Sequence, residues 1–360
     1  MSTIATGSPA AWKAKDLRAD ESWIFTLDER ARGHLTEAVR KARDPAKTLL
    51  DYRREDFDLG PAWPVIAAAF RETKRGRGIA LVRGLPREDL SAEDFELLTW
   101  AIGLHAGVAR PQGKSSQYIS AVRDEGTQYR TSGGRGYSSN AELDFHTDSA
   151  DVVALTTYNK AASGGMSIVT SSIAAYARME EKHPDLVGYL RQPIHFSRQQ
   201  EQAADETLSY PNPIFDEIDG ALFSKWNRNR MESAQKIEGV PRLIRRHREA
   251  LETFDLVVRE TDLAYTMYLE PGDMQLVNSH VTVHSRTDFV DHTDPAQKRT
   301  LFRLWLATPD GERLPESWRH AFRAVEPGTV RGGIRGQQYD ERRRAFEKRQ
   351  AADLGMTLTD

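Results

Sequence analysis

The sequence of 360 residues contains no cysteine. Disulfide bonds, thiolate metal sites and cysteine nucleophiles are therefore excluded, and any bound metal must be held by His, Asp or Glu. Long hydrophobic runs are also missing. No apolar segment approaches the roughly 20 residues of a membrane span, and the N-terminus has no basic segment followed by an apolar core. These absences predict a soluble, cytoplasmic protein with no membrane partner.

The sequence also has little net charge, because 50 basic and 53 acidic residues leave a formal charge of −3. Such a balance creates no global field that would attract nucleic acid or an anionic membrane. The basic cluster at 242–248 falls in a helical pattern, which we interpret as a solvated helix face. We therefore expect no nucleic-acid partner.

Linker-like stretches and internal repeats are absent as well, which predicts a single domain over residues 1–360. Within it we expect a mainly helical part at 1–78, a core with insertions at 79–308 and a C-terminal extension at 309–360. A highly charged helix is predicted at 337–354. We expect this helix to be either a peripheral brace or a contact in a homo-oligomer.

The spacing of apolar residues predicts an α+β fold with many short strands. Helices are expected at 28–42, 61–73 and 243–259, and Ser91 to Asp94 resembles a capping box before another helix. Turn signals such as Asp219-Gly220 separate the strands, which is typical of a sandwich or barrel with helices packed outside. The predicted strands are 79–84, 118–122, 152–158, 167–170, 193–197, 264–269, 274–277, 281–285 and 300–307.

A segment rich in Gly, Ser and Thr spans Arg123 to Ser139, directly before the first candidate metal ligands. We interpret it as a mobile loop. A loop of this length beside a site is either a lid or a plain surface excursion, and the sequence does not choose between them.

The tripeptide His146-Thr147-Asp148 places an imidazole and a carboxylate two positions apart. In extended backbone both side chains lie on the same face, so the pair can chelate one metal ion. A third donor from another strand would complete a set of two His and one carboxylate, which leaves three coordination positions open. The tripeptide alone is a weak signal, because it also occurs by chance.

Two histidines downstream, His280 and His284, are candidates for the third donor. They share a face if their strand is unbroken, since their separation is even. Spacing does not choose between them. For each, the alternative is a structural histidine with one ring nitrogen bonded to the backbone.

Residues 298–306 alternate so that Arg299, Leu301, Arg303 and Trp305 share one face. If that face points inwards, each guanidinium needs an anionic partner, because a buried unpaired charge is costly. A dicarboxylate cosubstrate would supply one, and arginine suits a terminal carboxylate by its forked geometry. The alternative is that this face is exposed to solvent.

Taken together and in order, these motifs resemble the TauD/TfdA superfamily of iron(II)/2-oxoglutarate dioxygenases. The resemblance runs from about residue 80 to 308, and the long gap between His284 and Arg299 is closest to the clavaminate-synthase-like branch. The motifs that carry it are His146-Thr-Asp148, Ser163-Gly-Gly-Met-Ser167, Pro271-Gly-Asp273, Asn278, His284-Ser-Arg286-Thr-Asp-Phe289 and Arg299-Thr-Leu-Phe-Arg303-Leu-Trp305.

The resemblance implies a jelly-roll core, or double-stranded β-helix, and an iron(II) site made by His146, Asp148 and His284. His284 is preferred over His280 because it precedes the Ser-Arg-Thr-x-Phe run. Arg299 matches the arginine that pairs with the distal carboxylate of 2-oxoglutarate. Ser167 falls where the family commonly has a threonine that helps this contact, and the serine keeps the hydroxyl.

The implied activity couples oxidative decarboxylation of 2-oxoglutarate by O2 to C–H oxidation of a small molecule. The carboxylate of Asp148 favours hydroxylation, desaturation or ring formation over halogenation, because family halogenases have a small residue there. Arg303 is a candidate for binding a substrate carboxylate, as are Arg110 and Arg130, so an amino acid or other carboxylate is the expected substrate. Arg286 has either a structural or a binding role.

A different class of function is a non-catalytic jelly roll that binds metal or a partner. Retention of His146, Asp148, His284 and Arg299 counts against it. Turnover of 2-oxoglutarate to succinate separates the two hypotheses.

Overall fold

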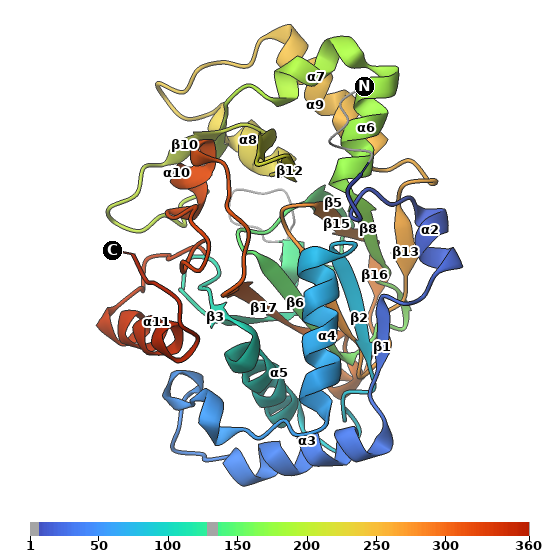
Figure 1. Cartoon of the computed structure of the whole chain (residues 1–360), viewed down its shortest axis with the longest axis vertical. Coiled ribbons are helices and arrows are strands. Elements are labelled where there is room, and N and C mark those ends of the chain that lie inside the picture. The colour runs from blue at the N-terminus through green and yellow to red at the C-terminus, as the bar shows by residue number, and fades with distance from the viewer. Residues whose placement is uncertain (1–6, 128–135, 360) are drawn as a thin grey trace.

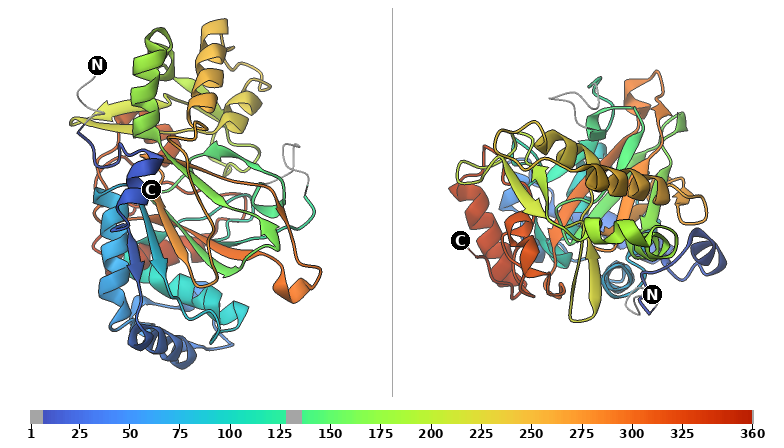
Figure 2. Two further views of the ribbon diagram at one scale, coloured as in Figure 1. Left: turned by 90° about the vertical axis from the view of Figure 1, so that its right-hand side faces the viewer. Right: turned by 90° about the horizontal axis from the view of Figure 1, so that it is seen from above.

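Two β-sheets pack face to face at the centre of the protein, as the computed structural model of residues 7–127 and 136–359 shows (Figures 1 and 2). The larger sheet has the strand order β1-β2-β14-β6-β17-β3, with β4 also paired to β17, and the smaller has the order β13-β8-β15-β5. All neighbours except β1 and β2 are antiparallel. The fold is α+β with a jelly-roll core, as predicted.

The strands of the larger sheet are β1 (Ile24–Thr26), β2 (Ile79–Arg83), β3 (Val108–Ala109), β4 (Ile119–Val122), β6 (Val152–Asn159), β14 (Met274–Asn278) and β17 (Thr300–Ala307). Those of the smaller sheet are β5 (Leu143–His146), β8 (Ser167–Ser171), β13 (Tyr265–Met267) and β15 (Thr282–Arg286). Three two-stranded sheets join β7 (Ser163–Gly164) with β16 (Phe289–Val290), β9 (Ile194–Ser197) with β10 (Ser209–Asn212), and β11 (Phe215–Ile218) with β12 (Ala221–Ser224).

The helices are α2 (Ala14–Ala19), α3 (Glu29–Ala42), α4 (Ala62–Arg75), α5 (Ala92–Ala106), α6 (Ser172–Lys182), α7 (Pro184–Leu190), α8 (Arg228–Ala234), α9 (Arg245–Val257), α10 (Arg319–Phe322) and α11 (Glu341–Asp353). The predicted capping interaction is present, because the Ser91 hydroxyl accepts a hydrogen bond from the backbone N–H of Asp94 at 3.1 Å. No helix of the described residues is both long and apolar enough to cross a bilayer.

The two faces of the larger sheet pack against different partners. Its outer face, which includes Phe302, Leu304 and Leu306 of β17, packs against α3, α4 and α5 in one apolar cluster. Its inner face, which includes Leu301 and Trp305, packs towards Val169 of the smaller sheet. The alternation predicted for β17 therefore separates the helix-facing side from the side that faces the second sheet.

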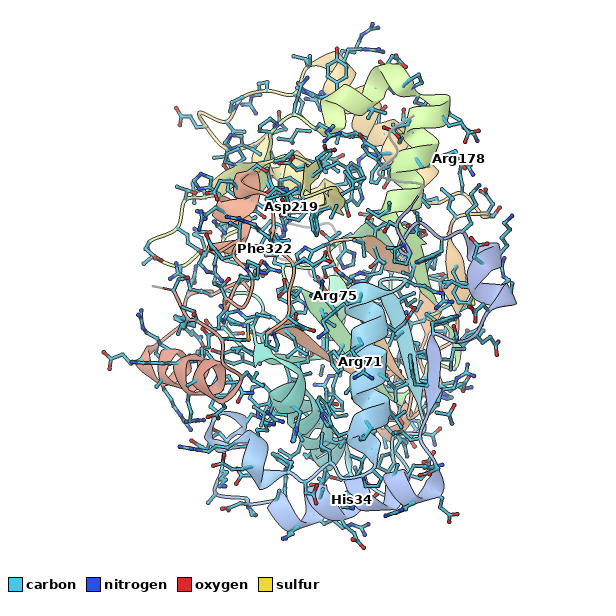
Figure 3. The ribbon with its side chains drawn as sticks, viewed as in Figure 1. His34, Arg71, Arg75, Arg178, Asp219 and Phe322 are labelled. Carbon is cyan, nitrogen blue, oxygen red and sulfur yellow. The ribbon has the colours of Figure 1, made fainter. Side chains whose placement is uncertain are left out.

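Arg71 and Arg75 lie on the exposed side of α4, away from this core, whereas Arg178 on α6 is largely buried (Figure 3). Arg178 is itself held by ion pairs to Glu260 and to Asp262. Helices α6, α7 and α9 gather at one end of the molecule, and α3 lies at the opposite end (Figure 1). The candidate site lies between the two sheets.

Every predicted strand is present with small shifts at its ends, but the insertion between β9 and α9 was not predicted in detail. Strands β10 to β12 have four residues each, and β10 contains Pro211 and Asn212, residues that carry little strand signal. The predicted loop at 123–139 includes residues 128–135, which lie outside the described residues.

Candidate functional site

His146 and His284 meet across two neighbouring strands. They are direct cross-strand partners of β5 and β15, and their ring centroids lie 4.4 Å apart. The Nδ1 of His146 lies 2.8 Å from the carbonyl oxygen of Asp144, so we assign the ring proton to Nδ1. The Nε2 of His146 is then left with its lone pair, which is the form that binds a metal ion.

Asp148 completes the group just beyond the end of β5. Its carboxylate oxygens lie 3.9 Å from Nε2 of His146 and 3.8 Å from Nε2 of His284. One potential ligand atom from each of the three residues lies within 4.8 Å of the others. The short connection is fixed from behind, because the N–H of Thr147 donates to the carbonyl of Trp226 at 2.7 Å.

The protonation states of the group suit a divalent cation. Burial and the neighbouring charge of His146 lower the pKa of His284 to about 3, so its imidazole is neutral at physiological pH. Burial alone would raise the pKa of Asp148, but the charge of Arg303, followed by those of the two histidines, outweighs burial and lowers it. Two imidazole nitrogens and one carboxylate form the donor set expected for non-haem iron(II).

His280, the alternative third donor, lies elsewhere. It precedes β15 in a turn, so the unbroken strand needed for it to share a face with His284 does not exist. Its Nε2 lies 2.9 Å from Oδ1 of Asp151, which also accepts from Nε of Arg331 at 2.7 Å. His280 is therefore part of a buried polar cluster with Asp151 and Arg331.

Arg299 points into a buried cavity between the two sheets. This cavity is also lined by Ser167, His284 and Arg303. The side chain is 5% exposed, and Nη1 makes a long contact of 3.5 Å to the carbonyl oxygen of Val122. No carboxylate among the described residues forms an ion pair with Arg299. Burial, followed by repulsion from Arg286, lowers the pKa of Arg299 to about 9, and the nearby charge of Asp291 offsets this only in part.

The double glycine before Ser167 makes room for this arginine. Gly165 has φ +71°, and a Cβ there would come within 3.1 Å of Nε of Arg299. A Cβ at Gly164, also at φ +71°, would overlap the backbone oxygen of Asp288 at 2.2 Å. Only glycine fits both positions without displacing the backbone.

Ser167 lies at the wall of the same cavity and contacts a residue that the sequence did not single out. Its hydroxyl lies 3.0 Å from Oε1 of Gln275 on β14, a fully buried amide whose Nε2 has no hydrogen-bond partner. Gln275 could have been noticed as a polar residue inside an otherwise apolar strand.

Arg303 and Trp305 continue the inward face of β17 towards Asp148. Nε of Arg303 donates to Gln112 at 2.9 Å, and Nη1 lies 3.6 Å from Oδ2 of Asp148. The indole N–H of Trp305 donates to the same Oδ2 at 2.9 Å. The alternative of a solvent-exposed face is therefore wrong for this strand.

Two further arginines have mainly structural contacts. Arg286 donates from Nη2 to the carbonyl of Ser139 at 2.8 Å and to that of Ala141, so it holds the backbone that precedes β5. Arg110, a substrate candidate from the sequence, forms a buried ion pair of 2.8 Å with Glu347 of α11 and is not directed at the site. Arg130 lies outside the described residues.

A second cavity opens on the other side of the metal-ligand candidates. It is lined by His146, Asp148, Arg303 and Trp305 and, from the insertion, by Asn227, Glu201 and Arg230. Arg230 donates to Glu201 at 2.8 Å and to the carbonyl of Ser197 at 3.1 Å. No motif in the sequence singled out these insertion residues, although Arg230 lies in α8 and Asn227 caps that helix.

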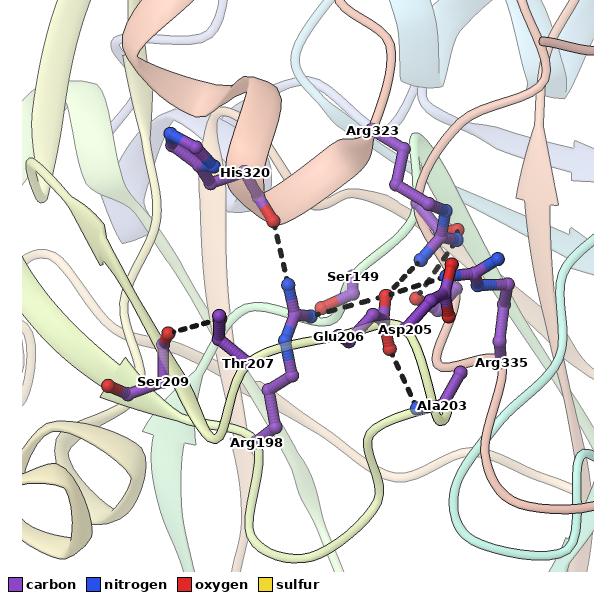
Figure 4. Close-up of polar contacts among 12 residues, drawn as sticks. Ser149, Arg198, Ala203, Asp205, Glu206, Thr207, Ser209, His320, Arg323 and Arg335 are labelled. Atoms are coloured by element: carbon purple, nitrogen blue, oxygen red, sulfur yellow. Dashed lines mark hydrogen bonds and ion pairs between the residues drawn. The ribbon is translucent and has the colours of Figure 1, made fainter. Parts of the chain in front are cut away.

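The wall that carries Glu201 is fastened to the C-terminal extension. Figure 4 shows Glu206 in contact with Arg198, Arg323 and Arg335, with separations of 3.6, 3.1 and 3.7 Å. The extension itself contributes Ile334 to the cavity lining. Residues far apart in the sequence thus build one wall.

Comparisons with known proteins agree with this geometry. A family model described as "Taurine catabolism dioxygenase TauD, TfdA family" matches residues 45–305. FR-33289 synthase of Streptomyces rubellomurinus is 30% identical over 314 residues, which cover 86% of this chain and 92% of that protein. The taurine hydroxylase-like protein SAT17 of Stachybotrys chartarum is 24% identical over 308 residues, covering 82% of this chain and 77% of that protein.

Solved structures share the fold. Asparagine oxygenase in complex with Fe(II), 3-hydroxyasparagine and succinate superposes with a TM-score of 0.62 at 20% identity, covering 82% of this chain and 98% of that one. The non-haem iron oxygenase OrfP in complex with Fe and α-ketoglutaric acid gives a TM-score of 0.56 at 14% identity, covering 79% and 93%.

Proposed function

The chain belongs to the TauD/TfdA family of Fe(II)- and 2-oxoglutarate-dependent dioxygenases, and from this premise we propose how its residues divide the reaction between them. The enzyme couples the oxidative decarboxylation of 2-oxoglutarate to C–H oxidation of a small molecule. We assign the iron ligands as His146, Asp148 and His284. The observation that carries the assignment is the convergence of their donor atoms within 4.8 Å beside a buried arginine that forms no ion pair with any carboxylate of the described residues.

Bound iron supplies the redox chemistry with O2, and the protein supplies position and charge. In this proposal Arg299 binds the distal carboxylate of 2-oxoglutarate and Ser167 adds a hydrogen bond in the same cavity. The dicarboxylate would neutralise the buried guanidinium, which removes the unfavourable energy of an unpaired charge. The apolar walls of this cavity, such as Val122, Leu155 and Leu301, exclude water from the cosubstrate.

The primary substrate is proposed to be a small carboxylate, with an amino acid as the favoured class, bound in the cavity lined by Arg303 and Asn227. Arg303 would contact the substrate carboxylate because its guanidinium lines this cavity close to Asp148. Support comes from two fold relatives whose structures contain hydroxyasparagine or (3S)-hydroxy-L-Arg. The cytoplasmic location stays a prediction.

Three single variants test the iron assignment. His146→Ala and His284→Ala are expected to lose Fe(II) and succinate formation, whereas His280→Ala is expected to keep both because its partner is Asp151. Iron content after anaerobic loading and succinate yield are the measurements. Loss of iron in His280→Ala with retention in His284→Ala would overturn the assignment.

The same assay separates the enzyme from a non-catalytic jelly roll. Iron-dependent conversion of 2-oxoglutarate to succinate without added substrate is expected for the enzyme, and its absence together with no iron binding would favour the non-catalytic alternative. A screen of amino acids and other carboxylates for stimulated succinate formation then identifies the substrate. Mass analysis of the product distinguishes hydroxylation from desaturation or ring formation.

A further inference from the structure

The two carboxylate oxygens of Asp148 have different surroundings. Oδ2 accepts a hydrogen bond of 2.9 Å from the indole N–H of Trp305, and Nη1 of Arg303 lies 3.6 Å from the same oxygen. Both oxygens also lie beside an imidazole, because Oδ2 is 3.8 Å from Nε2 of His284 and Oδ1 is 3.9 Å from Nε2 of His146. The difference between them is that Oδ2 accepts the hydrogen bond from β17, whereas Oδ1 accepts none from the side chains of the described residues.

The indole of Trp305 is itself firmly placed. The residue is 4% exposed, packs in the apolar cluster between the two sheets and sits opposite Val153 in the β17–β6 register. The guanidinium of Arg303 lies over its ring at 4.9 Å. An indole N–H can only donate a hydrogen bond, and in a buried setting few acceptors lie within reach of it.

The acceptor of this hydrogen bond differs from those of the other buried tryptophans. Trp12 and Trp23 donate to the backbone carbonyls of Arg77 and Leu17. The indole nitrogens of Trp100, Trp226 and Trp318 have no hydrogen-bond partner among the described residues. Trp305 is therefore distinguished by a carboxylate acceptor, and that acceptor belongs to a proposed iron ligand. The position of the indole on the inward face of β17 follows from its two-residue spacing from Arg303.

We propose that Trp305 is a positioning residue of the metal centre, which holds Oδ2 of Asp148 so that Oδ1 alone is presented to the metal. The inference rests on the proposed assignment of Asp148 as an iron ligand. A carboxylate bound through both oxygens would take two coordination positions, and one bound through a single oxygen takes one. With two histidines, only the single-oxygen arrangement leaves three positions for a chelating keto acid and O2.

Trp305 contributes more to this orientation than Arg303. The indole contact is shorter and its donor has one acceptor, whereas the Arg303 guanidinium also donates to Gln112. Loss of a hydrogen-bond partner in the shell around a metal ligand typically weakens metal binding or activity about 10- to 100-fold. Removal of the indole N–H is therefore expected to change metal binding itself, not only turnover.

The test compares Trp305→Phe with Trp100→Phe as a matched control. Both replace a buried indole by a smaller ring, but only the first removes an N–H that has a partner. We expect Trp305→Phe to bind Fe(II) at least about tenfold more weakly in anaerobic titration and to alter the visible spectrum of the Co(II)-loaded protein, which reports coordination number. Trp100→Phe should change neither. A Trp305→Phe protein with wild-type affinity and spectrum would overturn the proposal.

A second measurement on the wild-type chain keeps the proposal testable if Trp305→Phe does not fold. With 15N-labelled tryptophan, one of the seven indole N–H resonances is expected to move on addition of Zn(II) and also to move in Asp148→Ala. No resonance that responds to both changes would contradict the contact. The His146→Ala variant distinguishes a wrong metal assignment from a wrong role for Trp305. If His146→Ala binds Fe(II) normally, the metal assignment itself is wrong. If only Trp305→Phe binds Fe(II) normally, the role of the indole alone is refuted.

Discussion

Among the proposed site residues, Arg299 has the surroundings that point most clearly to an anionic ligand. It lies in a buried cavity, and the repulsion from Arg286 adds to the effect of burial in lowering its pKa to about 9. A guanidinium in this setting gains strongly from a carboxylate, and the forked donor pair can meet both oxygens of one. The residue thus provides a specific site for a diacid rather than for a neutral molecule.

Replacing the forked guanidinium of Arg299 by the single ammonium group of lysine tests its role in binding 2-oxoglutarate. Arg299→Lys is expected to raise the KM for 2-oxoglutarate by about tenfold, which corresponds to about 1.4 kcal/mol, because one of two parallel hydrogen bonds is lost. Iron content and the KM for the primary substrate should stay close to wild type. Steady-state succinate formation measures the two KM values and metal analysis measures the iron content. An unchanged KM for 2-oxoglutarate would contradict the assignment.

Ser167 makes a smaller contribution that depends on the amide of Gln275. If the Gln275 amide is turned so that Nε2 faces Ser167, the serine hydroxyl becomes free to donate to an anion and the buried Nε2 gains its acceptor. Ser167→Ala is then expected to raise the KM for 2-oxoglutarate roughly tenfold, the effect of about 1.5 kcal/mol for a hydrogen bond to a charged group.

Ser285 provides the control for that measurement. It lines the same cavity, but its hydroxyl donates to the carbonyl of Leu143 at 2.6 Å. Ser285→Ala should therefore leave the KM for 2-oxoglutarate unchanged. If both variants raise it equally, a general loosening of the cavity explains the effect and the specific role of Ser167 is wrong.

At the scale of elements, β17 connects the packing of the fold to the proposed chemistry. Alternate residues of this strand either pack under the helices or point between the sheets, so one face stabilises the protein while the other carries Arg303 and Trp305, with Arg299 just before the strand. A shift of one residue in register would exchange the two faces. The pairing of β17 with β4 and β6 on its two sides fixes that register.

Helix α11 is tied to the core by a buried carboxylate. Glu347 is 0% exposed, pairs with Arg110 and accepts hydrogen bonds from the hydroxyls of Tyr118 at 2.9 Å and Tyr339 at 2.7 Å. These contacts support the predicted role of α11 as a peripheral brace. Whether the helix also serves an oligomer stays a prediction.

Glu347→Gln is expected to lower the free energy of unfolding by roughly 3 kcal/mol, because Arg110 would remain buried without a counter-charge. Thermal or urea unfolding measures the change. Glu341→Gln in the exposed first turn of the same helix is the control and should have a small effect. Equal stability of the two variants would show that the buried ion pair does not hold α11 in place.

At the scale of the whole molecule, the proposed ligands and cosubstrate contacts come from both sheets. His146, Asp148 and His284 belong to the smaller sheet and its border, whereas Arg299 adjoins β17 of the larger sheet. Iron and 2-oxoglutarate together would therefore link the two sheets. A ligand that binds only the folded state stabilises it in proportion to the logarithm of its concentration.

Metal binding should consequently raise the melting temperature. At a metal concentration of about 100 times Kd the gain is about 2.7 kcal/mol, and a shift of several degrees is expected with Mn(II) as a redox-inert probe. A chelator should reverse the shift, and 2-oxoglutarate should enlarge it. His146→Ala is the control whose melting temperature should not respond, and an equal response of this variant would contradict the site.

Much of this arrangement was predictable because it depends on short-range periodicity. The strand segments, the two faces of β17 and the shared orientation of His146 and Asp148 follow from the two-residue repeat of extended backbone. The ordered motifs predicted the family, which the comparisons confirm. The helix at 28–42 and the cap at Ser91 follow from equally local signals.

The choice among equivalent residues needed the tertiary structure, because it depends on which partners the fold brings near. The sequence alone determined the set of candidate residues, which are His, Asp and Arg at even spacing in extended strands. The family resemblance favoured His284 over His280, but spacing did not, and the contacts of His284 with Asp148 and of His280 with Asp151 are set by packing. Packing also decided that Arg299 lies in a cavity while Arg110 pairs with Glu347. The physical reason is that side-chain direction is set locally, whereas charge compensation is set by residues more than a hundred positions away.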